Sequence, residues 1–229
     1  MNIVSIILAR GKSQGIPKKN LVNFCGKPLL YWSINQALNV KQISKVWVSS
    51  DDNKILAFAK KQGAKTILRP NKFSTNTSTS ESGYLHAINE IENNGEKIDI
   101  VIALQPTSPI RESMDIERAI KKFRIMKYDS MFSASDLGDF MIWKKTKNNK
   151  LYSWNYDSNK RPRRQDFGKQ YLENGSFYIF KPEVIKKFNN RFGKKVGIFL
   201  MDFWKAFEIN EPKDIKFCEL LMKYYLLKK

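Results

Sequence analysis

An apolar strand leads directly into a turn-rich, cationic loop in the run Leu8-Ala9-Arg10-Gly11-Lys12-Ser13-Gln14-Gly15-Ile16-Pro17-Lys18-Lys19-Asn20. The segment Ile3 to Ala9 is almost continuously apolar and rich in β-branched residues, which is typical of a buried parallel strand. Gly11 and Gly15 allow the backbone to turn tightly enough for its N–H groups to face an anion. Four side chains add positive charge to the loop, namely Arg10, Lys12, Lys18 and Lys19. We therefore predict a phosphate-binding loop after the first strand.

Helices and strands alternate along the rest of the chain. Apolar periodicity predicts strands at 45–50, 64–68, 98–104, 130–134, 175–180, 196–201 and 206–209. Helices are predicted at 28–39, 53–62 and 112–126, from the capping-box pattern Ser78-Thr79-Ser80-Glu81 to Glu92, and onwards from Pro182 and Pro212. One face of the last helix is expected to pack in the core: Ile215, Cys218, Leu221, Met222 and Tyr225. The alternation predicts an α/β fold with a doubly wound, mostly parallel, Rossmann-like sheet.

Ligands of such sheets bind at the carboxyl ends of the strands. Four polar residues each follow a predicted strand end: Arg10, Asp51, Arg69 and Gln105. We therefore expect these side chains to converge on one site.

Composition restricts the class of protein. The chain has 229 residues, of which 42% are hydrophobic, so it suits one sizeable core. No apolar run approaches the roughly 20 residues that span a bilayer, and the chain opens on a strand without a basic leader. Cys25 and Cys218 are the two cysteines, which fits free thiols in a reducing compartment. We expect a cytoplasmic protein that does not bind membranes.

The formal charge of +19 could indicate nucleic-acid binding. The lysines are, however, spread over many segments, and neither an RNA-binding signature with interleaved aromatic residues nor a helix-turn-helix pattern accompanies them. A scattered excess of lysine is typical of a solvated surface. We therefore expect no nucleic-acid partner, although a basic field would attract anionic substrates.

Two motifs together resemble one enzyme family. The first run matches L-A-R-x-x-S-x-G-[IL]-P-x-K-N, and Leu104-Gln105-Pro106-Thr107-Ser108-Pro109-Ile110-Arg111 is similar to L-Q-P-T-S-P-L-R. Both motifs are those of the acylneuraminate cytidylyltransferases, the CMP-sialic acid synthetases. Shorter matches cover most of the chain: Val48-Ser49-Ser50-Asp51, Leu68-Arg69-Pro70, Arg164-Gln165 and Asn174-Gly175-Ser176-Phe177-Tyr178-Ile179.

The resemblance implies a fold of the nucleotide-diphospho-sugar transferase type and a specific reaction. The anomeric hydroxyl of a nonulosonic acid attacks the α-phosphate of CTP, which yields a CMP-sugar and pyrophosphate. Arg10 and Lys19 match the family's catalytic, phosphate-binding cations. The nucleotide-binding positions correspond to Gly11, Ser13, Asn20, Arg69, Ser78 and Ser80, although Ser78 also has the alternative role of capping the following helix. Gln105 and Arg164 match acceptor-binding positions, and a guanidinium suits the carboxylate of the acceptor.

The family holds Mg²⁺ with a D-x-D motif, and this chain departs from it. The corresponding residues are Glu208 and Asn210, separated by Ile209. Magnesium commonly uses one or two carboxylates together with phosphate oxygens and water, so a site with less fixed charge is expected here. The alternative is that both residues only order the turn before the helix that starts at Pro212.

The range 135–174 breaks the alternation within an otherwise single domain of residues 1–229. Asn148-Asn149-Lys150 predicts a hairpin turn, and Trp143, Tyr152, Trp154 and Tyr156 suit an interface. The plain interpretation is a surface excursion. The resemblance implies instead a protruding lobe through which two copies form a homodimer and exchange sugar-binding residues.

Two other functions stay open at this point. One is a cytidylyltransferase for a different 2-keto sugar acid, such as legionaminic, pseudaminic, Kdn or Kdo acid. The other is a non-catalytic relative that binds nucleotide, because the metal motif is weakened.

Overall fold

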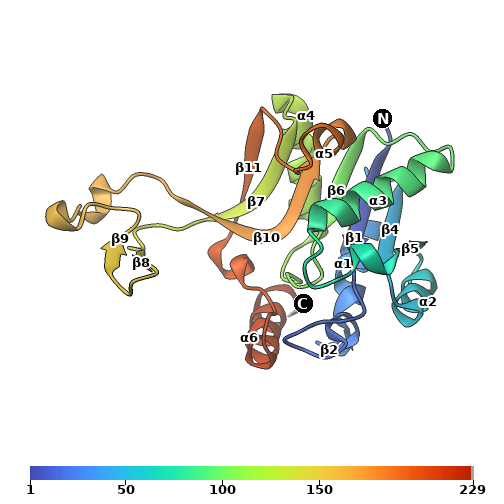
Figure 1. Ribbon diagram of the computed structural model, residues 1–229, viewed down its shortest axis with the longest axis horizontal. Helices are drawn as coiled ribbons and strands as arrows, with labels where there is room; N and C mark the ends of the chain where they lie inside the picture. Colours follow the sequence, from blue (N-terminus) through green and yellow to red (C-terminus); the bar gives the residue numbers. More distant parts are fainter. Residues whose placement is uncertain (228–229) are drawn as a thin grey trace.

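A single seven-stranded sheet organises the molecule (Figure 1). The computed structural model describes residues 1–227, and its strand order is β11-β7-β10-β6-β1-β4-β5. The strands are β1 (Ile3–Leu8), β4 (Lys45–Ser50), β5 (Lys65–Leu68), β6 (Ile100–Leu104), β7 (Ser130–Asp136), β10 (Tyr171–Phe180) and β11 (Val196–Met201). The pairings β1–β4, β1–β6, β4–β5 and β7–β11 are parallel, whereas β10 runs antiparallel to both β6 and β7. The predicted mostly parallel sheet is confirmed.

Helices cover both faces of this sheet. They are α1 (Leu29–Leu38), α2 (Asn53–Lys61), α3 (Ser80–Asn93), α4 (Ser113–Met126), α5 (Pro182–Phe188) and α6 (Pro212–Met222). Two short strands, β2 (Asn23–Phe24) and β3 (Lys27–Pro28), pair before α1. Single turns of 3₁₀ helix lie at Lys19–Leu21, Asn71–Phe73, Ser158–Lys160, Arg164–Asp166 and Phe203–Ala206, and a π turn lies at Lys223–Leu227. None of the helices within residues 1–227 is long and apolar enough to cross a membrane.

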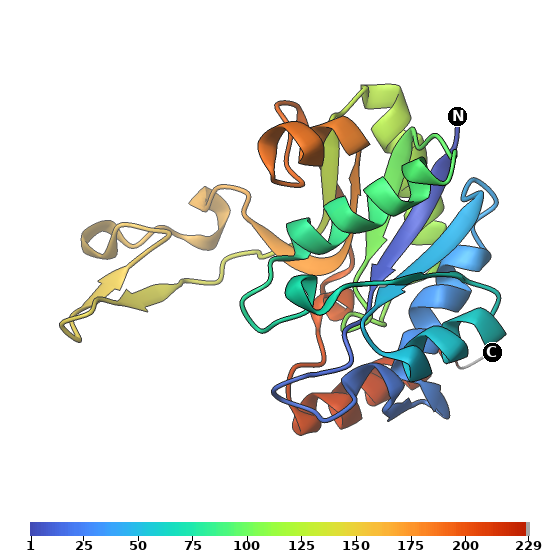
Figure 2. The same cartoon turned by 45° about the vertical axis from the view of Figure 1, so that its right-hand side comes forward.

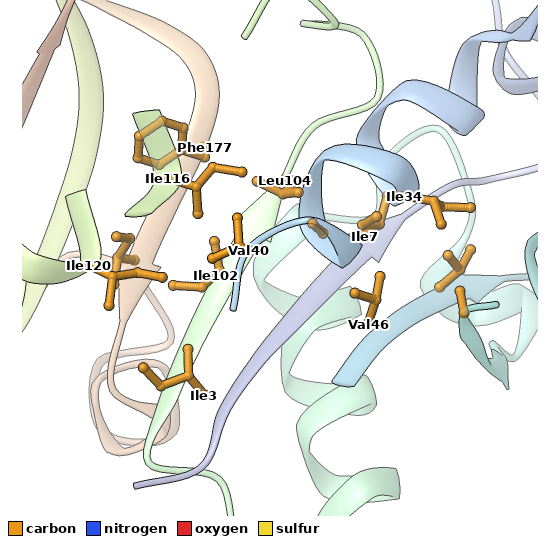
Figure 3. Packing of buried hydrophobic residues seen from close by; sticks show 14 of the residues in the cluster. Ile3, Ile7, Ile34, Val40, Val46, Ile102, Leu104, Ile116, Ile120 and Phe177 are labelled. Atoms are coloured by element: carbon orange, nitrogen blue, oxygen red, sulfur yellow. The ribbon is translucent and has the colours of Figure 1, made fainter. Parts of the chain in front are cut away.

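Successive residues of the central strands enter different cores, because side chains alternate across a sheet. Ile7 of β1 belongs to one cluster with Ile34 of α1 and Ile116 of α4, and Figure 3 shows Ile7 beside Ile34. Its neighbour Ile6 belongs to a second cluster on the other face, which contains Ile88 of α3. This division into two cores is why β1 reads as a continuous apolar run in the sequence.

Two local predictions are wrong. The range 206–209 is not a strand: after the turn at Phe203–Ala206 the chain is extended but unpaired with the sheet, and its Ile209 is buried in a third cluster with α6. The cap of α3 is Thr79 rather than Ser78, since the Thr79 hydroxyl accepts a hydrogen bond from the Ser82 N–H.

The predicted buried face of α6 is correct only in part. Cys218 and Met222 are buried, and Ile215 and Leu221 pack partly against the same cluster. Tyr225 is instead 48% exposed, because it lies in the π turn beyond α6. Its ring stacks on that of Trp204, with 4.1 Å between the ring centroids.

A protruding arm connects β7 to β10. We use this name for residues 137–170, which extend away from the sheet in both views (Figures 1 and 2). The arm contains the antiparallel hairpin of β8 (Trp143–Lys145) and β9 (Leu151–Ser153). Asn149 has a left-handed backbone in the connecting turn (φ 62°), which confirms the predicted turn. Large apolar side chains are exposed on the arm: Phe140, Trp143, Leu151, Tyr152 and Trp154.

Candidate active site

A cavity of about 540 Å³ opens at the carboxyl ends of β1, β5 and β6. Three loops form most of its wall, and they contribute Arg10 to Asn20 after β1, Arg69 to Ser80 between β5 and α3, and Gln105 to Thr107 after β6. Its volume lies in the range typical of small-molecule sites. Most of the predicted site residues line it: Arg10, Ser13, Lys19, Asn20, Arg69, Ser78, Ser80, Gln105 and Asn210.

The cavity is positively charged. Arg10, Lys19 and Arg69 all line it, and none of the described residues in its lining carries a carboxylate. The first turn of α3 also reaches the cavity through Thr79 and Ser80. Because the amino end of a helix carries partial positive charge and free N–H groups, it adds to the attraction for an anion. The arrangement suits a polyanionic ligand such as a polyphosphate.

Lys19 is held at the point where the first loop meets the segment before α6. Its ammonium donates to the carbonyl oxygen of Ile209 at 3.1 Å. Burial lowers the pKa of Lys19, and the neighbouring Arg10 lowers it further, while Glu208 partly opposes both. The loop passes so close to Asn210 that a Cβ on Gly15 would lie 2.4 Å from the Asn210 carbonyl oxygen. Gly15 is therefore needed for close approach, and not only for a tight turn.

Asn20 fixes the backbone that presents Arg10. Its side-chain amide donates to the carbonyl oxygen of Arg10 at 2.8 Å, and Asn20 is itself buried. The Arg10 guanidinium reaches across the cavity to the carbonyl oxygen of Thr75 at 3.3 Å. The motif residues Arg10, Lys19 and Asn20 thus form one connected wall.

Arg69 forms the opposite wall from a buried position. Its Nε donates to the Ser74 hydroxyl at 2.8 Å, and burial lowers its pKa despite the nearby Asp51 carboxylate. Ser78 stabilises the adjacent loop, because its hydroxyl accepts from the Thr75 N–H and donates to the Lys72 carbonyl oxygen, both at 3.0 Å. The Ser78 side chain is therefore already engaged within the loop.

Some predicted residues lie elsewhere. The Gly11 N–H donates to the Asp51 carboxylate at 2.9 Å, and both residues line a second hollow that also contains Lys12 and Lys18. The expected convergence of strand ends therefore holds for Arg10, Arg69 and Gln105 but not for Asp51. The Gly11 N–H binds the Asp51 carboxylate on the side of the second hollow, and Ser13 of the same loop lines both hollows.

Arg164 lies on the arm and is not part of the cavity wall. Its side chain is 85% exposed and its Nε lies 3.7 Å from the Asp139 carboxylate. The cavity within one chain therefore lacks the predicted guanidinium for an acceptor carboxylate.

Glu208 and Asn210 lie beside the Lys19 end of the cavity. Asn210 lines it, and the Asn210 amide donates to the half-buried Glu208 carboxylate. Burial raises the pKa of Glu208, which means that Asn210 and Lys19 compensate its negative charge only in part. Hard oxygen donors with incomplete compensation suit Mg²⁺. Among residues 1–227, however, no three His, Cys, Asp or Glu side chains gather into a metal-binding group, so ligands from a bound phosphate would be needed.

A buried arginine behind the cavity has no role in the sequence prediction. Arg111 donates through Nη1 to the carbonyl oxygens of Ser108 at 2.6 Å, Ser176 at 2.8 Å and Gln105 at 3.2 Å, and through Nη2 to the Ser33 hydroxyl. Burial lowers its pKa to about 9, so it remains charged at neutral pH. Arg111 closes the loop that carries Gln105. The motif contains this residue, but its burial was not readable from the sequence.

A second missed residue anchors the segment before Glu208. Lys205 is 3% exposed, and its ammonium pairs with Glu112 at 2.9 Å and with Asp115 at 2.7 Å. This ion pair attaches the turn at Phe203–Ala206 to the amino end of α4. No sequence signal distinguishes Lys205 from the many exposed lysines.

Comparison with known proteins gives a consistent result. The family model described as cytidylyltransferase matches residues 4–228. N-acylneuraminate cytidylyltransferase A of Danio rerio is 35% identical over 197 residues, which are 85% of this chain and 45% of the fish protein. Pseudaminic acid cytidylyltransferase of Campylobacter jejuni is 29% identical over 227 residues, which are 97% of each chain. The chain thus spans less than half of the fish relative and almost all of the bacterial one.

A solved structure has the same fold. CMP:2-keto-3-deoxy-manno-octonic acid synthetase complexed with CTP has a TM-score of 0.76 to this chain at 17% identity, with 99% of this chain and 100% of that chain covered. At this identity the likeness shows the architecture alone. It confirms the predicted nucleotide-diphospho-sugar transferase type of fold.

Proposed function

We propose, since the chain belongs to the cytidylyltransferase family, that it transfers CMP from CTP to the anomeric hydroxyl of a nonulosonic acid and releases pyrophosphate. The observation that carries this proposal is the cavity at the strand ends. Three cations and the amino end of α3 surround it, and no described lining residue is a carboxylate. A triphosphate, with its several negative charges, is the ligand that this charge distribution favours.

Arg10 and Lys19 are proposed to stabilise the transferring phosphate. The reaction needs little covalent chemistry from the protein, because its barrier comes mainly from charge on the phosphate oxygens and from alignment of nucleophile and leaving group. The forked guanidinium of Arg10 can bind two oxygens at once. Lys19, which lies against the Ile209 carbonyl oxygen, adds a second cation from the same wall.

Mg²⁺ is proposed as the cofactor, held by Glu208 and Asn210 together with the triphosphate. When bound, the ion would neutralise phosphate charge and act as a Lewis acid toward the oxygens. Lys19 stays next to Glu208 and limits how much the carboxylate repels the nucleotide.

The remaining wall is proposed to bind the nucleoside and the acceptor. Asn20, Arg69 and Ser80 surround the space for cytosine and ribose, with backbone N–H groups and hydroxyls as additional donors. Gln105 faces the acceptor. The acceptor class rests on the relatives, one named for N-acylneuraminate and one for pseudaminic acid. Both names denote nonulosonic acids, so we propose this class rather than one member of it.

A homodimer is proposed to complete the acceptor site. Trp143 and Trp154 on the arm are 50% and 54% exposed, and such aromatic side chains are enriched at interfaces. Arg164 would then reach the cavity of a second copy and bind the acceptor carboxylate. Sedimentation equilibrium tests the assembly: the chain should form a dimer, and Trp154→Asp should shift it to the monomer.

Pyrophosphate release from CTP tests the activity. The panel of acceptors should contain N-acetylneuraminic, pseudaminic, legionaminic, Kdn and Kdo acids, each with Mg²⁺. We expect pyrophosphate release with at least one nine-carbon acid, and none with CTP alone. Absence of release with all of them, from protein that is folded by circular dichroism, would contradict the proposal and favour the non-catalytic alternative. Binding of duplex DNA at moderate salt would indicate a nucleic-acid role instead.

A further inference from the structure

Strand β10 contains a bulge next to the cavity. Glu173 pairs with Ala134 of β7 and Tyr178 pairs with Phe132, so five steps along β10 match two along β7. The Asn174 side chain replaces the lost ladder bonds: its Oδ1 accepts from the Ser176 N–H at 3.2 Å and from the Ser133 hydroxyl at 2.6 Å. Bulges of this kind often redirect side chains near active sites.

Gly175 lies at the centre of this bulge. Its backbone is left-handed (φ +63°), and a Cβ at this position would lie 2.1 Å from Glu208 Oε1 and 3.3 Å from Gln105 Oε1. The first of these distances is far too short for any real contact. The Glu208 carboxylate thus occupies the space that a side chain on residue 175 would fill, and the Gln105 amide oxygen lies at the edge of that space.

The same bulge also fixes the backbone of Gln105. The carbonyl oxygen of Ser176 accepts from the Gln105 N–H at 3.3 Å and from the buried Arg111 at 2.8 Å. Arg111 in turn donates to the Gln105 carbonyl oxygen. Gln105 is therefore restrained through its backbone by Ser176 and beside its side chain by Gly175.

We propose that Gly175 is a positioning residue for the transfer reaction, whose missing side chain leaves room for the Glu208 carboxylate and the Gln105 side chain where the bulge meets the cavity. This inference rests on the function proposed above. A displacement of about 1 Å in a positioning group can lower the rate about a hundredfold. A Cβ 2.1 Å from Glu208 Oε1 would force that oxygen to move by about 1 Å to reach an ordinary contact distance.

The test compares Gly175→Ala with a matched control. Gly95, which follows α3, is also left-handed (φ +82°), and among residues 1–227 nothing lies within 4 Å of the Cβ that alanine would add there. Both variants carry similar backbone strain, but only Gly175→Ala collides with Glu208. We expect kcat/KM for the acceptor to fall about a hundredfold in Gly175→Ala and to stay within about threefold in Gly95→Ala. CTP binding without added metal should change little in either variant.

A double-mutant cycle tests the contact itself. Glu208→Asp shortens the side chain by one methylene and makes room for a Cβ on residue 175. The effects of substitutions at two residues in contact are not additive. In the Glu208→Asp background, Gly175→Ala should therefore lower kcat/KM for the acceptor by less than about threefold. If Gly175→Ala alone fails to fold, the double variant should fold, and its failure to do so would overturn the proposal.

The outcomes separate this inference from the proposed function. No pyrophosphate release by the unchanged protein with any acceptor contradicts the function and the positioning role together. An active unchanged protein in which Gly175→Ala behaves like Gly95→Ala, or in which the two substitutions add, overturns the positioning role alone.

Discussion

Replacement of Arg111 by methionine should destabilise the protein and the loop that carries Gln105 in the cavity wall. The guanidinium is buried and holds three carbonyl oxygens, two of them at short distances, 2.6 Å to Ser108 and 2.8 Å to Ser176. Methionine has a similar length but no donor. The substitution therefore leaves both oxygens without their charged partner in a region closed to solvent.

The structure gives the size of the effect. An unsatisfied buried acceptor costs about 1–3 kcal/mol, so two of them cost about 2–6 kcal/mol. Part of this loss is offset, because the guanidinium no longer has to be kept out of water, a cost that is visible in its pKa of about 9. The net loss should be about 3 kcal/mol in the free energy of unfolding. For a chain of this size, that corresponds to a decrease of about 6–12 °C in Tm.

Urea unfolding followed by circular dichroism measures this loss. Arg118→Met is the control, because Arg118 is exposed on the following helix α4, seven residues along the chain from Arg111. Gln105 should also become less well placed, so KM for the acceptor should rise more than KM for CTP. A loss below about 1 kcal/mol, or equal losses in the two variants, would refute the view that Arg111 supports this loop.

Three further predictions concern the site and its surroundings. Lys19→Ala and Arg10→Ala should each lower kcat about a hundredfold or more, as expected for groups that stabilise transition-state charge. The control Lys12→Ala, which changes a residue that lines the second hollow, should change kcat by less than about threefold. Equal effects of Lys12→Ala and Lys19→Ala on kcat would contradict the assignment. Glu208→Gln should abolish or greatly weaken magnesium-supported turnover, and Asn210→Asp should lower the magnesium concentration that gives the half-maximal rate. If the curves of rate against magnesium concentration are unchanged in both variants, Glu208 and Asn210 have a structural role. Burial raises the pKa of Tyr84 to about 12, so the unfolded chain loses this proton at a lower pH than the folded protein. The free energy of unfolding should therefore fall by about 2 kcal/mol between pH 10 and pH 12. Urea midpoints at pH 9 and 11.5 should show a smaller fall in Tyr84→Phe.

Local patterns account for most of the correct sequence predictions. The strand at Lys45–Ser50 has the predicted bounds, because its apolar run is bounded by polar residues on both sides. The wrong strand at 206–209 had a similar apolar composition. Its Ile209 is buried against α6 instead, and only the packing of the last helix selects between these two uses of the same side chains.

The residues of the candidate site likewise fall into those that a local motif predicts and those that only the fold brings together. Arg10, Lys19 and Asn20 lie within eleven residues and act through one loop, so their association was readable from a motif. Arg111 and Lys205 required the fold, since their partners are up to 78 and 93 residues away in the chain. A side chain such as Ser78 shows the limit of local inference, because Ser78 and Thr79 can both cap a helix and the backbone geometry selects Thr79.

The succession of most helices and strands along the chain, the cationic loop after the first strand and the nature of its charges follow from the sequence alone. Apolar patterns of period two or of period three to four, and a short cationic turn, are local properties. The tertiary structure alone decides where side chains from distant segments meet. It places Glu208 against Gly175, holds Arg111 against Ser176, and separates Asp51 and Gly11 from the cavity. These arrangements depend on close packing between elements far apart in the chain, and no residue pattern within one element encodes that packing.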